Sequence, residues 1–133
     1  MLKAHAFSLI ELLISLVIVT LLASVAYPSF QDVIIKSRRS DAQSELIKAQ
    51  IAQSNYRILH SSYTDDANII GLPSNDPYYI FNLVSASANN YLIKATAKAE
   101  SLQYKDKSIC RVLFVDQNSN KTSDGITDNT ICW

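Results

Sequence analysis

The apolar residues of this chain are concentrated near its N-terminus. Residues 7–27 form an almost unbroken apolar run of 21 residues, in which Glu11 is the one charged side chain. A helix of this length is about 30 Å long, which matches the hydrocarbon core of a bilayer. The pattern therefore predicts a helix that is able to cross a membrane.

A second helical pattern follows this run. Residues 31–60 contain neither Gly nor Pro, and Pro28 should kink the helix without ending it, because helix-forming residues resume directly after it. At 100° per residue the apolar positions fall on two opposite sides. We interpret one side as packing on the chain's own sheet and the other as facing a neighbouring molecule; isolated surface isoleucines are the alternative. The first side carries Ile35, Ala42, Leu46, Ala49 and Tyr56, and the second carries Ile47, Ile51 and Ile58.

The C-terminal half shows the short period of β-strands. Residues 60–77 are rich in Ser, Asp, Asn, Gly and Pro and are predicted to form a loop. One long helix followed by an antiparallel meander predicts an α+β roll, in which a sheet of about four strands packs on the second half of the helix. The expected strands are residues 78–84, 91–99 and 108–115, with a short fourth piece at 130–133.

Two interpretations of the start of the chain compete. The six residues MLKAHA carry Lys3 and precede the apolar run, as in an export signal. In an ordinary signal peptide the small residues at 24–26 would direct cleavage before Tyr27. In the alternative, cleavage follows Ala6 and the apolar run stays in the mature protein. Glu11 favours the alternative, because a carboxylate in a membrane helix costs about 2.5–3.5 kcal/mol and is usually retained for a partner.

The segment around this second cleavage site resembles a known processing site. Residues 6–11, AFSLIE, resemble the prepilin peptidase site of type IV pilins, in which a basic leader ends in a small residue, a Phe follows and a Glu occupies the fifth mature position. Ala6 stands where the family usually has Gly, and Pro28 stands where many pilins have a helix-bending Pro. The resemblance to minor pilins of the PilE kind continues at residues 36–43, 53–56 and 61–64. It also includes the pair Cys110 and Cys132, with Trp133 following the second cysteine.

The resemblance implies a type IV pilin-like roll with three parts. These are a leader peptide at 1–6, a transmembrane and assembly helix at 7–30, and a periplasmic or extracellular globular domain at 31–133. The implied processing is cleavage between Ala6 and Phe7 and N-methylation of Phe7. The expected location is the bacterial inner membrane before assembly and an extracellular pilus afterwards. Expected partners are other pilins, major and minor, the prepilin peptidase and the pilus assembly machinery.

Glu11 has a physical role in such a filament. Cleavage frees a positive amine at Phe7, which the Glu11 carboxylate of a neighbouring subunit can meet. A charge pair in a low-dielectric interior is favoured over either charge alone. We expect this pair to set the register of helices that otherwise slide on apolar surfaces, with Pro28 as the second assembly residue. The alternative is a tolerated carboxylate near a helix start, where the helix dipole favours it.

The two cysteines lie in the last quarter of the chain. Because the chain is predicted to be exported, Cys110 and Cys132 are expected to form one disulfide that encloses 21 residues. Two buried free thiols are the alternative. The disulfide would tie the C-terminus to a strand, and in type IV pilins a C-terminal loop of this kind is often exposed on the filament and carries specificity.

The charge balance limits the classes of partner. Lys and Arg number 12, and Asp and Glu number 12, so a grossly basic nucleic-acid binder is excluded and a local basic patch is not. Such a patch could grip DNA phosphates, and nearby tyrosines could stack on bases. A solvated sheet edge kept soluble by lysines is the alternative. The candidate DNA contacts are Lys94, Lys98, Lys105, Lys107 and Arg111.

Other chemistry has little support. Residues 116–128 begin like a calcium loop, but Lys121 replaces the Gly of the sixth position and Thr127 replaces the Glu of the twelfth. No catalytic grouping can be read from the spacing, so we expect no enzyme activity, no cofactor and no metal. The predicted function is that of a minor pilin in a type IV pilus, supporting pilus assembly, twitching motility, adhesion or DNA uptake. A DNA receptor for natural transformation and a type II secretion pseudopilin are the alternatives.

Overall fold

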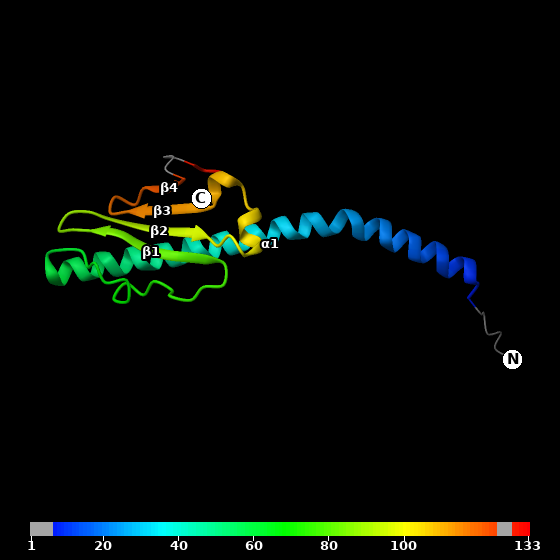
Figure 1. The fold of residues 1–133 in the computed structure, drawn as a ribbon, viewed down its shortest axis with the longest axis horizontal. Helices are drawn as coiled ribbons and strands as arrows, with labels where there is room; N and C mark the ends of the chain where they lie inside the picture. The colour runs from blue at the N-terminus through cyan, green and yellow to red at the C-terminus, as the bar shows by residue number, and fades with distance from the viewer. Residues whose placement is uncertain (1–6, 125–128) are drawn as a thin grey trace. The chain divides into compact units, whose positions relative to one another are not determined.

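The computed structural model describes residues 7–124 and 129–133, which contain one long helix and one four-stranded sheet (Figure 1). Contacts divide the chain between Ile34 and Ile35 into two compact units. We call residues 7–34 the N-terminal segment and Ile35–Trp133 the globular unit. The elements are α1 (Leu9–His60), β1 (Tyr79–Ala86), β2 (Tyr91–Ala97), the short 3-10 helices η1 (Leu102–Lys105) and η2 (Ser108–Cys110), β3 (Val112–Asp116) and β4 (Lys121–Ser123).

Three hydroxyl groups of the N-terminal segment are satisfied within the helix itself. The Ser8 carbonyl accepts the Glu11 amide at 3.1 Å, which closes the first turn. Three hydroxyls along the apolar stretch donate to carbonyls three or four residues earlier, at 2.7–2.8 Å. This back-bonding lets polar side chains occupy an apolar helix without partners from elsewhere. The hydroxyls belong to Ser15, Thr20 and Ser24.

Helix α1 passes through its proline and ends in a recognisable cap. Pro28 lies inside α1, so the helix continues beyond it as predicted. After the last residue, His60, Ser61 has a φ of 59°, and its amide donates to the Arg57 carbonyl at 3.0 Å. A left-handed residue at this place is a common way to satisfy the last carbonyls of a helix. The loop predicted after residue 60 therefore begins where expected.

The core of the globular unit lies between α1 and one face of the sheet (Figure 1). The first apolar side of the helix is buried, including Ile35, Ala42, Leu46 and Ala49. Strand β2 alternates buried and half-buried side chains along its whole length. One face of β2 therefore packs inward and the other faces outward. The fully buried apolar residues of the sheet are Ile93, Ala95, Leu113 and Val115.

The sheet is an antiparallel meander in the order β1-β2-β3-β4. A register shift between Leu83 and Ser85 interrupts the pairing of β1 with β2. One long helix packed on a four-stranded antiparallel sheet confirms the predicted α+β roll.

Two strand predictions were wrong. Residues 108–110, expected to begin the third strand, form η2, in which the Cys110 amide donates to the Lys107 carbonyl at 2.8 Å. The fourth strand is β4, and residues 130–132 form a turn in its place. Residues 130–132 do not form a strand because side chains of α1 donate hydrogen bonds to the carbonyls of Ile131 and Cys132, which a strand would use for pairing.

Candidate functional site

The N-terminal segment presents an apolar surface that the described chain does not cover. Part of α1 is long and apolar enough to cross a membrane, and none of that stretch is buried. The large apolar side chains between Phe7 and Phe30 are 50–76% exposed. A contiguous surface of this size must be covered by lipid or by other helices, since water does not tolerate it.

Glu11 is the one carboxylate within this apolar surface. It lies in the first turn of α1, four positions after Phe7. Among the described residues, no hydrogen bond or ion pair engages its carboxylate. Both Glu11 and Phe7 are exposed. The predicted cleavage partner Ala6 lies outside the described residues, so the structure places only the Phe7 side of that site.

The second apolar side of α1 is also uncovered in the globular unit. Ile51 and Ile58 are 56% and 81% exposed, and Ile47 is half-buried. Leu59, which the periodicity did not assign to this side, is 80% exposed beside Ile58. The predicted division of the helix into a covered and an uncovered apolar side therefore exists in the structure.

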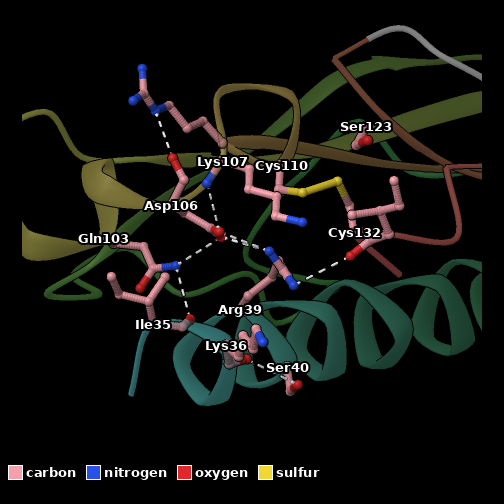
Figure 2. A network of polar contacts seen from close by, with 12 residues as sticks. Ile35, Lys36, Arg39, Ser40, Gln103, Asp106, Lys107, Cys110, Ser123 and Cys132 are labelled. Atoms are coloured by element: carbon pink, nitrogen blue, oxygen red, sulfur yellow. Dashed lines mark hydrogen bonds and ion pairs between the residues drawn. A yellow bond between two sulfur atoms is a disulfide. The ribbon is translucent and has the colours of Figure 1, made fainter. Parts of the chain in front are cut away.

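A buried polar network joins α1 to the segment between β2 and β3 (Figure 2). The Arg39 Nη1 lies 2.8 and 2.9 Å from the two carboxylate oxygens of Asp106. Arg39 Nη2 also donates to the Ile131 carbonyl at 3.4 Å. Arg39 is 9% exposed and Asp106 is 6% exposed. The burial makes this pair mutually dependent, because either charge alone would be left in a medium of low dielectric constant.

Gln103 extends the network toward the sheet. Its Nε2 donates to the Ile35 carbonyl at 3.1 Å and to the Tyr79 hydroxyl at 2.9 Å (Figure 2 shows the first of these). Burial, together with the nearby Asp106 charge, raises the pKa of Tyr79 well above its usual value. Tyr79 therefore stays neutral, and its hydroxyl accepts the Gln103 amide.

The disulfide closes the C-terminal end of the same network. Cys110 and Cys132 are bonded and buried, which confirms the predicted C-terminal disulfide. The Cys132 carbonyl also accepts a hydrogen bond from Gln43 on α1. The C-terminal residues are thus held by one covalent bond and by two side chains of α1.

The predicted basic cluster separates into two places. Lys94 lies in β2 opposite Asn82 and Phe114, on the outward face of the sheet. Lys98 follows that strand and donates to the Asp76 carbonyl. Three of the five cations instead lie around η1 and η2. Of these, Lys105 and Lys107 are exposed, and the Arg111 guanidinium stacks over the Tyr104 ring at 4.0 Å.

The calcium-like segment is a hydrogen-bonded turn. Asp116 Oδ1 accepts the amides of Asn118 and Asn120, each at 2.9 Å, and Asp116 Oδ2 accepts the Asn120 side-chain amide at 2.8 Å. The acidic side chain is therefore used to hold the turn between β3 and β4. Thr127 and Asp128 lie outside the described residues.

Sequence reasoning missed the partner of Arg39. The sequence pattern singles out neither Asp106 nor Gln103 as a contact of the helix. Neither pattern nor spacing links residues 67 or 68 positions apart. The sequence offered one signal, which is that Arg39 falls on the same side of the helix as Ala42 and Leu46.

Two known families match this chain. Residues 1–27 match the prokaryotic N-terminal methylation motif, and residues 28–114 match the family described as type IV minor pilin ComP, DNA uptake sequence receptor. The second match covers more than half of the chain. The chain belongs to the type IV pilin family. This membership confirms the resemblance based on residues 6–11 and the segments after the apolar run.

Curated relatives agree with this assignment. The type IV wide pilus major component PilA4 of Thermus thermophilus is 35% identical over 96 residues, which are 70% of this chain and 73% of that protein. The type IV major pilin PilA of Myxococcus xanthus is 34% identical over 96 residues, 71% of this chain and 43% of that protein. The fimbrial protein EcpC of Eikenella corrodens is 33% identical over 95 residues, 70% of this chain and 62% of that protein.

Solved pilins share the fold. A type IV pilin from Shewanella oneidensis superposes with a TM-score of 0.55 at 20% identity, covering 74% of this chain and 97% of that one. The non-core minor pilin PilV of Neisseria meningitidis gives a TM-score of 0.56 at 16% identity, covering 74% and 93%. These two likenesses concern the fold. The matches to the family models and to the curated relatives make this pilin a subunit of a type IV pilus, assembled with other pilins and anchored in a membrane by its N-terminal apolar helix. The family is structural rather than catalytic.

Proposed function

We propose that this pilin is a minor subunit that enters the filament through its N-terminal segment. Its parts are a leader at 1–6, a transmembrane and assembly helix at 7–30 and a globular domain at 31–133. The prepilin peptidase cuts after Ala6 and methylates Phe7 while the helix lies in the inner membrane. The assembly machinery then draws the subunit into the pilus. The observation that supports this is the uncovered apolar surface of α1, which contains a single carboxylate.

Glu11 sets the position of the subunit in this proposal. The Phe7 amine of the mature chain is positive, and the Glu11 carboxylate has no partner among the described residues of its own chain. In the dry interior of a bundle of such helices, pairing these two charges between neighbours compensates the desolvation of both. Apolar packing alone would leave the helices free to slide, since lipid and side chains are equally apolar.

Glu11→Ala tests this pairing in a strain that produces the pilus. We expect the variant to be cleaved and folded but absent from sheared pili, because its partner amine would be buried without a counter-charge. Glu45→Ala is the matched control, since Glu45 is a helical carboxylate paired only with Lys48 at the surface. Normal amounts of Glu11→Ala in sheared pili would contradict the proposal.

A type II secretion pseudopilin would share this N-terminal chemistry. The two functions differ in the phenotype of a deletion strain. Loss of twitching motility or of surface pili with normal protein secretion supports a pilus subunit, and loss of secretion with normal pili supports the pseudopilin.

DNA capture is the second candidate function, and the match to the family described as a DNA uptake sequence receptor favours it. Lys94 and Lys98 occupy the same outward side of β2 and its continuation, two positions from Thr96 on either side. Cations spaced along one strand can follow a phosphate backbone. Lys94 and Lys98 are the proposed DNA contacts. The three candidate cations around η1 and η2 are not part of this surface.

The DNA proposal is tested with the full chain in detergent micelles and a fluorescent DNA duplex. We expect salt-sensitive binding that Lys94→Glu with Lys98→Glu weakens strongly, with the salt slope reduced by about two because two phosphate contacts are lost. Lys48→Glu with Lys121→Glu is the charge-matched control. If the wild-type chain does not bind at low salt, or if both pairs weaken binding equally, DNA capture through this face is wrong.

A further inference from the structure

The positive charge of the globular unit is gathered at one end. The stretches 35–41 and 99–111 contain six basic and three acidic residues, a net charge of +3 in a chain whose total is zero. The first stretch is the first part of α1 in the globular unit, and the second contains η1 and η2. Gln103 holds the two stretches together through the Ile35 carbonyl at 3.1 Å. We call these two stretches the basic end.

The fold removes one of the acids from the surface of the basic end. Asp106 points toward Arg39, as Figure 2 shows, and its exposed fraction is 6%. Its neighbours Lys105 and Lys107, and Lys36 on α1, remain exposed. Among the described residues, neither salt bridge of the structure engages these three lysines. The exposed acids left in the two stretches are Asp41 and Glu100.

The basic end also exposes one aromatic and one aliphatic side chain. Tyr104 and Leu102, both on η1, are each 44% exposed. The Arg111 guanidinium lies 4.0 Å from the centre of the Tyr104 ring, which keeps that ring among cations. Tyrosine beside lysine and arginine is the combination that suits the boundary between lipid and water.

The chain itself brings this end close to a membrane. Lys36 follows Tyr27, the last residue of the apolar run, by nine positions. As helix this spacing corresponds to about 13 Å of rise, of which the headgroup layer occupies about 5–7 Å. Lys36 therefore lies within about one Debye length, about 8–10 Å at physiological salt, of the headgroups. Basic residues this close to a membrane segment are attracted by anionic headgroups.

We propose that the basic end binds the phosphate headgroups of anionic phospholipids in the membrane that holds the N-terminal segment. Lys36, Lys105 and Lys107 supply the ammonium groups, and Tyr104 lies at the interface. The contact holds the globular unit on the bilayer before assembly and is released when the subunit leaves the membrane. This proposal concerns the membrane-bound subunit and is independent of DNA capture.

The test uses the full chain in nanodiscs, either of pure phosphatidylcholine or with added phosphatidylglycerol. The rate at which an amine reagent labels each lysine is measured by peptide mass spectrometry. We expect phosphatidylglycerol to slow labelling of Lys36, Lys105 and Lys107 by about fivefold each, an effect lost in high salt. Lys48 and Lys121, exposed elsewhere in the globular unit, are the internal controls and should not change.

Three outcomes would overturn the proposal. The first is equal labelling of the basic end in both kinds of nanodisc. The second is equal protection by inorganic phosphate in phosphatidylcholine discs, which would make the site a general anion site. The third is protection by duplex DNA without protection by phosphatidylglycerol. In a Lys105→Glu, Lys107→Glu chain, phosphatidylglycerol should no longer slow the labelling of Lys36. Circular dichroism verifies that this variant is folded.

Discussion

Arg39 on α1 and Asp106 at the end of η1 form a buried ion pair across 67 positions of the chain. The same carboxylate caps the backbone of Lys107, accepting its amide at 2.8 Å, and the same guanidinium reaches the Ile131 carbonyl at 3.4 Å. One pair of side chains therefore fixes the position of η1, η2 and the C-terminal turn on the helix. The α1 surface is connected to the disulfide loop through this pair.

Breaking this pair should destabilise the globular unit strongly. Asp106→Asn leaves the Arg39 charge buried without compensation, and Arg39→Ala does the same for Asp106, so we expect each to lower the free energy of unfolding by about 3–5 kcal/mol. Chemical denaturation of the full chain in micelles measures this. Lys48→Ala, which removes an exposed i,i+3 pair, should cost less than about 1 kcal/mol. Equal effects of the buried and the exposed variant would show that the pair is not a key contact.

The disulfide should contribute independently of that pair. Replacing Cys110 and Cys132 by Ala opens a loop of 21 enclosed residues, for which the chain-entropy estimate is about 3 kcal/mol. Because Arg39 and Gln43 still bind the carbonyls of Ile131 and Cys132, we expect the C-terminal turn to loosen without unfolding. Hydrogen exchange should therefore rise more in residues 129–133, which also open locally, than in β2, where it follows only the lower global stability. Exchange that rises equally in both would contradict a local role.

Alkaline pH should lower the free energy of unfolding through the buried tyrosines. Burial, with the charges of Tyr63 and Asp116 nearby, raises the pKa of Tyr91 to about 12, compared with about 10 in the unfolded chain. The resulting stabilisation is complete below the unfolded pKa and is lost as the pH rises from about 10 to about 12, because the unfolded state gives up its proton first.

Tyr91→Phe should reduce this alkaline loss. We expect similar free energies of unfolding for the variant and the wild type near neutral pH, and a smaller loss for the variant above about pH 10. Part of the loss should persist, since the pKa of Tyr79 is also raised by burial. Parallel pH curves for the two proteins would show that Tyr91 does not contribute.

The uncovered side of α1 in the globular unit should matter for assembly and not for folding. Ile51→Glu and Ile58→Glu place charges at positions that are 56% and 81% exposed, so the free energy of unfolding should change by less than about 0.5 kcal/mol. If this side contacts another pilin, incorporation into sheared pili should fall at least severalfold. Ile69→Glu is the control, because Ile69 is 53% exposed outside α1. Equal incorporation of all three variants would show that this side of α1 does not contact another pilin.

Local patterns predicted the elements better than their edges. The strand expected at 78–84 extends to Ala86, and the one expected at 91–99 ends at Ala97, because backbone pairing decides where a strand stops. β4 has only three residues, Lys121–Ser123, and exists because it pairs with β3. A polar segment of this length carries no strand signal of its own. The cleavage and methylation at Ala6 and Phe7 remain predictions.

The sequence by itself determined the membrane-competent helix, the covered side of α1, the disulfide and the family, because each depends on residues close in the chain or on composition. Tertiary structure decided which charged side chains are exposed and able to bind a partner. It buried Asp106 against Arg39 and separated Lys94 from Lys105 and Lys107. It also made a 3-10 helix of residues 108–110 and a turn of residues 130–132, both of which were expected to be in strands. These outcomes depend on contacts between residues that are distant in sequence, and the free energy of a charge is set by what surrounds it after folding.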